Sequence, residues 1–237
     1  MEAQNSLGNI VKNLFYAPSN SFESLLKNGR AWFPLLILVL VNAIFYIVYF
    51  QSVDFTWSMQ HAVEAQAGSS MSPAQKEQAL KMYESMGVSA MMGLSIGSSV
   101  LFIPIMLALF SVYYLIVSNI RNDNLSYGKC FVITSWSALI GALSIIIGTL
   151  RVLFASTDQI PQTVRQGMNL NDLFFGVEAS SDWFNFLNNL DPTLIWAAVI
   201  ASIAYKTFTK ASTTAAFFIG FLPNILIYGI WALIIVA

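Results

Sequence analysis

Charged residues are scarce in this sequence and make up only 10% of its 237 residues. Ordinary soluble domains carry about 25% charged residues. One stretch, Ser85 to Ile120, contains no Asp, Glu, Lys, Arg or His at all. The chain is instead 57% hydrophobic. This balance argues against a soluble domain and predicts a protein whose main solvent is lipid.

Cysteine and histidine are almost absent, which removes most catalytic and metal chemistry. The single cysteine, Cys130, excludes an intrachain disulfide and a cysteine-rich metal site. A metal site needs several convergent ligands, and His61 is the only histidine. The topology predicted below places Cys130 and His61 at opposite membrane faces, which argues against a Cys–His nucleophile pair. We therefore expect no catalytic residues, no cofactor and no metal.

Recognisable nucleotide-binding and hydrolase motifs are also missing. The sequence contains no phosphate-binding loop, no G-x-S-x-G element and no H-E-x-x-H element. Its net charge of −1 offers no electrostatic argument for nucleic acid. The interiors of the apolar segments hold no ionisable group, which argues against an ion-coupled transporter.

The long apolar segments predict an all-α bundle of five transmembrane helices with interfacial amphipathic helices. Val88 to Ser118 alone is about 46 Å long as a helix, more than the roughly 30 Å of hydrocarbon in a bilayer. The fourth predicted span is the shortest, because its uncharged window runs only from Pro192 to Tyr205. It extends to Phe208 if the long side chain of Lys206 reaches from the span to the membrane surface. The predicted spans are about 31–53, 88–118, 130–155, 192–208 and 212–236, within a membrane domain 31–237.

Three polar regions outside the spans carry their own helix signals. Residues 1–30 predict two amphipathic helices on the cytoplasmic membrane surface, the second capped by Asn20 or Ser21; a partly disordered tail is the alternative. Ser72, Pro73 and Gln75 form a helix-start pattern, and that helix should stop at Gly87. The acidic loop 156–191 predicts one or two interfacial helices.

Small residues recur at four-residue spacing in two spans. Small side chains let a neighbouring backbone approach closely, so these faces most often pack the bundle, with a dimer face as the alternative. Prolines inside spans remove a helical hydrogen bond and should produce kinks. The predicted helix-packing positions are Ser89, Gly93, Gly97, Ser137, Gly141 and Gly148, and the predicted kinks are at Pro104 and Pro223.

The distribution of basic residues predicts the orientation. If the N-terminus is cytoplasmic, the five-span topology places seven Lys and Arg residues on the cytoplasmic side and four outside. That asymmetry follows the positive-inside rule. We therefore expect a cytoplasmic N-terminus and a C-terminus at the outer face.

Several short segments resemble the YIP-domain family of polytopic membrane proteins. Its eukaryotic members are Rab/Ypt-interacting proteins of the early secretory pathway. The resemblance implies a five-span fold and brings no catalytic residues. The segments that carry it are 13–18 with Ser21 and Phe22, then Trp32-Phe33-Pro34-Leu35, Trp196, and 207–211.

The chain departs from the eukaryotic pattern in its short N-terminal region and its longer outer loops. We therefore expect a bacterial member in the inner (plasma) membrane. The leading hypothesis is a non-enzymatic scaffold or adaptor that acts on membrane organisation or on trafficking-like binding of a partner. Its expected partners are membrane lipids, together with a protein partner or a second copy, and not nucleic acid. The alternative is a lipid-translocating, scramblase-like protein or a small-solute transporter, for which the short fourth span would supply a thin spot.

Overall fold

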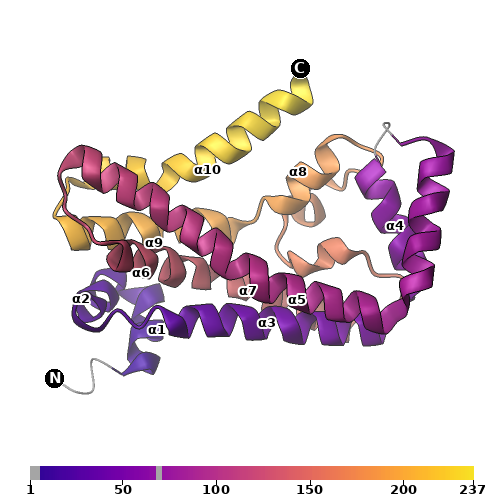
Figure 1. Ribbon diagram of the computed structural model, residues 1–237, viewed down its shortest axis with the longest axis horizontal. Coiled ribbons are helices and arrows are strands. Elements are labelled where there is room, and N and C mark those ends of the chain that lie inside the picture. Colours follow the sequence, from indigo (N-terminus) through magenta and orange to yellow (C-terminus); the bar gives the residue numbers. More distant parts are fainter. Residues whose placement is uncertain (1–5, 68–70) are drawn as a thin grey trace. The chain divides into compact units, whose positions relative to one another are not determined.

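The computed structural model is all-helical and describes residues 6–67 and 71–237 (Figure 1). No strand occurs in these residues, so the predicted all-α fold is confirmed. The first five residues of the predicted leader lie outside the described part. The helices are α1 (Leu7–Tyr16), α2 (Pro18–Asn28), α3 (Trp32–Ser52), α4 (Phe55–Ala67), α5 (Pro73–Arg121), α6 (Tyr127–Ala138), η2 (Leu139–Gly141), α7 (Ala142–Leu153), η3 (Gln162–Arg165), η4 (Asn171–Phe175), α8 (Trp183–Asn189), α9 (Pro192–Thr209) and α10 (Thr213–Val236).

Four helical segments are long and apolar enough to cross a membrane: Trp32–Ser52, Pro73–Arg121, Tyr127–Leu153 and Thr213–Val236. A fifth is added if α8 and α9, which are bent by 50° relative to each other, form one broken span. Only 17% of the apolar window in α5 and 11% of that in α10 is buried within the chain. Such exposed apolar flanks suit a lipid solvent, because in lipid they carry no hydrophobic penalty. The chain is an integral membrane protein.

The residues group into two compact units, and the division falls inside α3, α5, η2, α9 and α10. Unit 1 holds the residues up to Leu38, together with Phe102–Ile140 and Leu194–Gly229. Unit 2 holds Val39–Leu101, Gly141–Thr193 and the residues from Ile230 onward.

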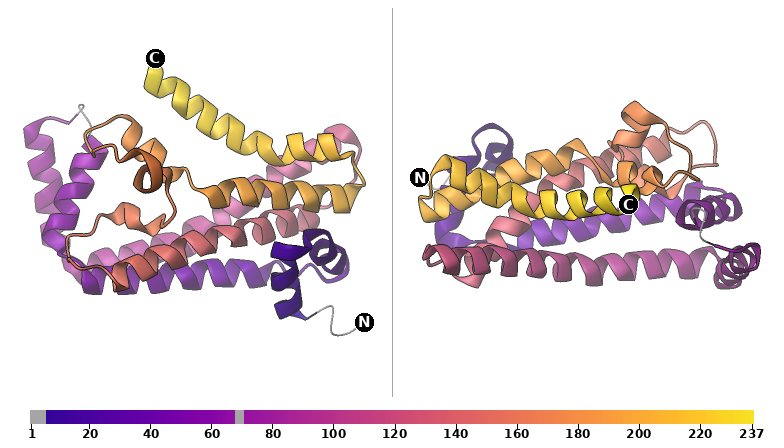
Figure 2. Two further views of the ribbon diagram at one scale, coloured as in Figure 1. Left: turned by 180° about the vertical axis from the view of Figure 1, so that it is seen from behind. Right: turned by 90° about the horizontal axis from the view of Figure 1, so that it is seen from above.

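In unit 1, the leader forms two helices, as predicted, and α1 lies beside α2 (Figures 1 and 2). Ile10 and Leu14 of α1 and Phe22 of α2 are buried, whereas Phe15 and Leu26 are exposed, so protein covers only part of each apolar face. The position of these helices on the membrane surface stays a prediction. The predicted cap at Asn20 or Ser21 is wrong, because α2 already begins at Pro18, whose fixed φ suits a first helical turn. Ser21 is instead buried, and its hydroxyl donates to the carbonyl of Ile10 at 2.8 Å.

The core of unit 2 is built on aromatic residues of α3. Phe45, Tyr49 and Phe50 are buried, and the rings of Phe45 and Tyr49 stack with centroids 5.5 Å apart. The hydroxyl of Tyr49 lies 2.5 Å from Ser58 Oγ and donates to the carbonyl of Ile160 at 2.8 Å. One side chain thus joins α3 to α4 and to the loop that follows α7.

The start of α5 has the predicted capping box. Gln75 Oε1 accepts from the Ser72 amide at 2.8 Å, and the Gln75 amide donates to Ser72 Oγ at 3.4 Å. Gly87 has φ of +69°, a conformation that glycine adopts without a steric penalty, and it interrupts the helical geometry inside α5. The predicted end of the first helix at Gly87 is therefore correct, although α5 continues to Arg121 beyond this break.

Helix α4 was not predicted; no helix was expected between the first span and the helix that starts at Pro73. Its signal was present at Asp54, whose Oδ1 accepts from the Trp57 amide at 3.0 Å in the manner of an N-cap. The helix is only weakly amphipathic, so periodicity alone does not reveal it.

Candidate functional site: a polar cavity around His61

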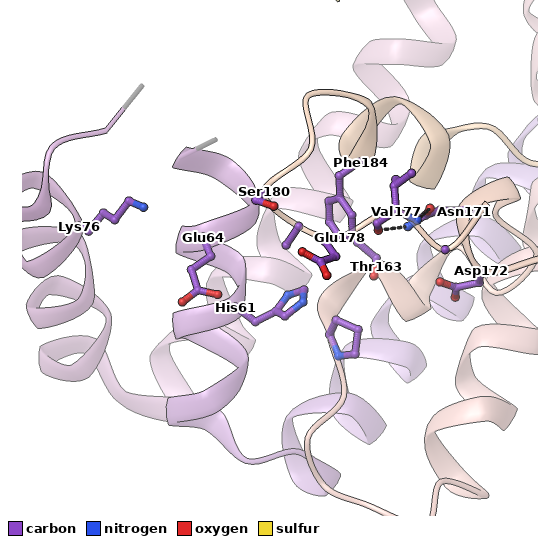
Figure 3. A pocket seen from close by; sticks show the side chains of 13 residues that line it. His61, Glu64, Lys76, Thr163, Asn171, Asp172, Val177, Glu178, Ser180 and Phe184 are labelled. Carbon is purple, nitrogen blue, oxygen red and sulfur yellow. Dashed lines mark hydrogen bonds between the residues drawn. The ribbon is translucent and has the colours of Figure 1, made fainter. Parts of the chain in front are cut away.

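Unit 2 contains an open polar cavity of about 680 Å³ (Figure 3). Its walls come from α4, from the first turn of α5 and from the segment between Pro161 and Phe184. We call it the His61 cavity, after the side chain that lies near its centre in Figure 3. It is lined by His61, Glu64, Lys76, Pro161, Thr163, Asn171, Asp172, Gly176, Val177, Glu178, Ala179, Ser180 and Phe184.

Asparagine side chains hold the loop wall of this cavity in shape. Buried Asn171 donates from Nδ2 to the Val177 carbonyl at 3.1 Å and accepts from the Val177 amide at 2.8 Å. Asn185 on α8 donates to the Ala65 carbonyl on α4 at 2.9 Å. These bonds satisfy loop backbone groups that would otherwise lack partners, and they connect the loop to α4.

The imidazole of His61 lies between two aromatic rings. It stacks on Trp57 with centroids 5.1 Å apart and meets Phe184 at 6.0 Å in a tilted arrangement. Partial burial lowers the pKa of His61 below its ordinary value, and the nearby charge of Glu64 opposes that shift only in part. The ring is therefore neutral at physiological pH, with aromatic rather than nucleophilic neighbours.

Acidic side chains outnumber basic ones around the cavity. Glu64, Asp172 and Glu178 line it, against Lys76 and His61. Asp172 is already engaged by Arg151 Nη1 at 2.6 Å. In the part of the chain that the structure describes, no ion pair involves Glu64 or Glu178. In Figure 3 the Glu178 carboxylate lies beside the His61 ring, whereas the Glu64 side chain runs along α4 and does not point at the ring. Both carboxylates line the cavity and can receive a cationic group.

The arrangement suits recognition better than bond-making chemistry. Within residues 6–67 and 71–237, no three metal-ligating side chains lie close enough to hold an ion. Cys130, the only thiol, belongs to α6 in unit 1. What the cavity offers is a polar surface with the carboxylates of Glu64 and Glu178 and an aromatic wall.

The predicted small-residue face of α5 is open. Ser89, Gly93 and Gly97 are exposed, and a Cβ atom at either glycine would meet no described atom within 4 Å. The packing role of this face, and the alternative of a dimer face, stay predictions. Gly141 likewise has open space where a Cβ would stand, and it ends the 3₁₀ turn η2 between α6 and α7.

At Gly148 the backbone does approach closely, but the partner is the short 3₁₀ turn η3 in the loop after α7 and not another spanning helix. A Cβ there would lie 2.2 Å from the carbonyl oxygen of Val164 and 2.9 Å from that of Arg165. Gly167 shows the reciprocal contact, with the Gly148 nitrogen 2.3 Å from its ideal Cβ. Ser137, the last predicted packing position, is buried on α6, and its hydroxyl has no hydrogen-bond partner.

The two predicted kink prolines lie inside α5 and α10. Pro223 cannot donate to the carbonyl of Ile219, four residues earlier. Tyr113 Oη donates to that carbonyl at 2.7 Å and so replaces the missing bond. Neither Tyr113 nor Gly220 was among the predicted positions; an ideal Cβ at Gly220 would lie 2.1 Å from Ser202 Oγ. A proline inside a span leaves one helix carbonyl without its usual donor, so it predicts that a hydroxyl on a neighbouring helix donates to that carbonyl.

A sequence model of the Yip1 domain matches residues 12–235, nearly the whole chain. The chain belongs to the Yip1 domain family. Yip1-domain proteins are membrane proteins implicated in membrane trafficking, and they are generally non-enzymatic. The matched Yip1 domain includes every residue that lines the His61 cavity. No curated protein and no solved structure matches the chain.

Proposed function

We propose that this Yip1-domain protein is a membrane adaptor whose His61 cavity binds a segment of a partner protein. The supporting observation is the pair Glu64 and Glu178 beside an aromatic wall, in a cavity of about 680 Å³. A Lys or Arg side chain of the partner would lie between the two carboxylates. The ring of Phe184 and the stem of the bound side chain would exclude water, which strengthens such a pair.

Site-specific photocrosslinking in cells tests this role. A photoreactive residue at Ser180, which lines the cavity, should give a discrete protein adduct. The double variant Glu64→Gln/Glu178→Gln should abolish the adduct. The matched control Glu77→Gln, on exposed α5 outside the cavity, should retain it. An adduct that persists in the double variant, or that is lost equally in the control, would refute the proposed cation site.

Lipid translocation is the second candidate, because unit 1 holds a small cavity beside α9. Its volume is about 170 Å³, and Thr134, Ser137 and Asn224 supply its polar lining. The Ser137 hydroxyl is buried without a partner, so an incoming polar group could satisfy it. Purified protein in proteoliposomes should move a fluorescent phospholipid if this candidate is correct, and Ser137→Ala should slow that movement. Absence of movement would support the adaptor.

The bacterial inner membrane, with the N-terminus in the cytoplasm, is the compartment and orientation that we infer. The support is the excess of Lys and Arg on one side of the five-span topology. A periplasmic phosphatase reporter fused after Ala237 should be active, and a cytoplasmic reporter at the same site should be silent. The opposite result would mean that the chain crosses the membrane four times instead of five, most simply because the α8–α9 pair does not span it.

A further inference from the structure

Unit 1 contains a second cavity, of about 430 Å³, where four helices begin or end. It lies between the end of α2, the start of α3, the start of α6 and the end of α9. Two candidate spans begin beside it, at Trp32 and Tyr127. Both aromatic rings are exposed, as amphipathic rings are at headgroup depth. The cavity is therefore placed at a membrane boundary.

The polar end of this cavity carries only positive charge. Arg30 and Lys129 line it, and none of the described residues that line it is acidic. The first turn of α6 adds amide groups without intrahelical acceptors at Tyr127 and Gly128. These donors and the helix dipole favour an anion at the same place. Two cationic side chains and a helix start thus converge on one hollow.

The cationic end is held in place by the corner between α2 and α3. Gly29 ends α2 with φ of +57°, and its carbonyl accepts from Trp136 Nε1 at 3.2 Å. Trp136 is fully buried and stacks on Phe33 with centroids 5.8 Å apart. Arg30 follows with φ of +48°, a conformation that few non-glycine residues adopt. The backbone of Arg30 is therefore fixed relative to α6.

The remaining lining of the cavity is apolar. Leu25, Leu26, Phe131, Val132 and Phe208 supply it. Leu26 is 37% exposed, so this apolar surface is open rather than sealed. A small soluble anion would use the cationic end alone and leave this surface without a function.

We propose that this cavity binds one anionic phospholipid, with its phosphate between Arg30 and Lys129 and the start of an acyl chain on Leu26, Phe131 and Phe208. The ligand chemistry is a phosphate monoanion attached to an apolar chain. The position at the start of two candidate spans matches the depth of such a headgroup. This inference is independent of the His61 cavity, which belongs to unit 2.

Native mass spectrometry of the full-length protein in mild detergent tests the site. The wild type should retain phosphatidylglycerol in preference to phosphatidylcholine. Arg30→Gln/Lys129→Gln should weaken phosphatidylglycerol binding by about 10-fold or more, since each basic residue near a membrane surface contributes a factor of about 5. The control Lys12→Gln/Lys81→Gln removes the same amount of charge outside the cavity. It should change binding less than 3-fold, because salt screens the attraction between the lipid and distant charges.

Further arms of the experiment separate the ligand sources and guard against misfolding. Inorganic phosphate at millimolar concentration should not displace the lipid; displacement would show that the site holds free phosphate instead. If the double variant fails to fold, Lys129→Gln alone, at an exposed position, should still weaken binding about 5-fold. Equal retention of the two lipids by the wild type, or equal losses in the double variant and the control, would overturn the proposal.

Discussion

Replacing Gly148 with alanine tests whether loop packing holds unit 2 together. A Cβ at this position would lie 2.2 Å from the Val164 carbonyl oxygen and 2.9 Å from that of Arg165. Both oxygens belong to the backbone, so no side-chain rotation can relieve the contact. The loop would have to move away from α7, and the hydrogen bond from the Gly167 amide to the Ser144 carbonyl, now 3.2 Å, would lengthen.

Two opposing effects set the size of the change. Alanine favours a helix over glycine by roughly 0.5–1 kcal/mol. Overpacking a tight site costs about 1–3 kcal/mol, and the contact at Gly148 is at the severe end because the obstacle is backbone. Gly97→Ala is the matched control, since the new Cβ would meet no described atom within 4 Å. Both glycines lie inside helices, so the preference for alanine cancels in the comparison, and the difference between the two variants should be about 3 kcal/mol, the upper end of the overpacking cost.

Thermal unfolding in detergent measures this difference. For a chain of about this size, 1 kcal/mol corresponds to roughly 2–4 °C in Tm. Gly148→Ala should thus unfold on the order of 10 °C below Gly97→Ala, and Gly167→Ala should behave like Gly148→Ala. If Gly148→Ala were as stable as Gly97→Ala, the close approach of loop and helix would be wrong. If Gly97→Ala were the more damaging, the open face of α5 would be a contact surface after all.

Three further changes probe other parts of the fold. Tyr113→Phe should cost about 1 kcal/mol of stability in the wild type but little in a Pro223→Ala background, where the alanine amide restores the helical bond; a double-mutant cycle measures this coupling. Asp191→Ala should lower the stability measured in thermal unfolding by about 1–3 kcal/mol, because this buried carboxylate accepts from a serine hydroxyl of α7 and from a backbone amide at 2.7 Å. A loss of only a few tenths of a kcal/mol, as at an exposed residue, would contradict that reasoning. The lowered pKa of His61 means that the unfolded chain takes up the proton first, so stability should fall as pH drops below about 6.5, and His61→Gln should flatten the dependence of Tm on pH.

The sequence predicted the helical class and much of the local helix chemistry, because these depend on near neighbours. Hydropathy located the long apolar segments, and Ser72 with Gln75 marked the start of α5. Periodicity did not reveal which small residues are in contact. Gly93 and Gly148 have the same four-residue spacing to another small residue, yet one faces open space and the other a loop backbone. That difference depends on where a distant segment folds, which local spacing does not record.

The His61 cavity was missed for a related reason, since the loop that forms its wall derives its shape from polar residues inside apolar segments. Arg165 Nη1 donates to Oδ1 of Asn42, which is 4% exposed in the middle of α3. Ser144 of α7 likewise donates to buried Asp191 at the start of α9. Each of these polar residues lowers the mean hydropathy of its segment, whether or not it has a hydrogen-bond partner. In the folded protein, however, a buried polar group stabilises the fold once it has such a partner. Together with the contact at Gly148, these bonds attach the loop to α3 and α7. The cavity is therefore a property of the folded membrane domain, and an isolated peptide of residues 156–191 should not reproduce it.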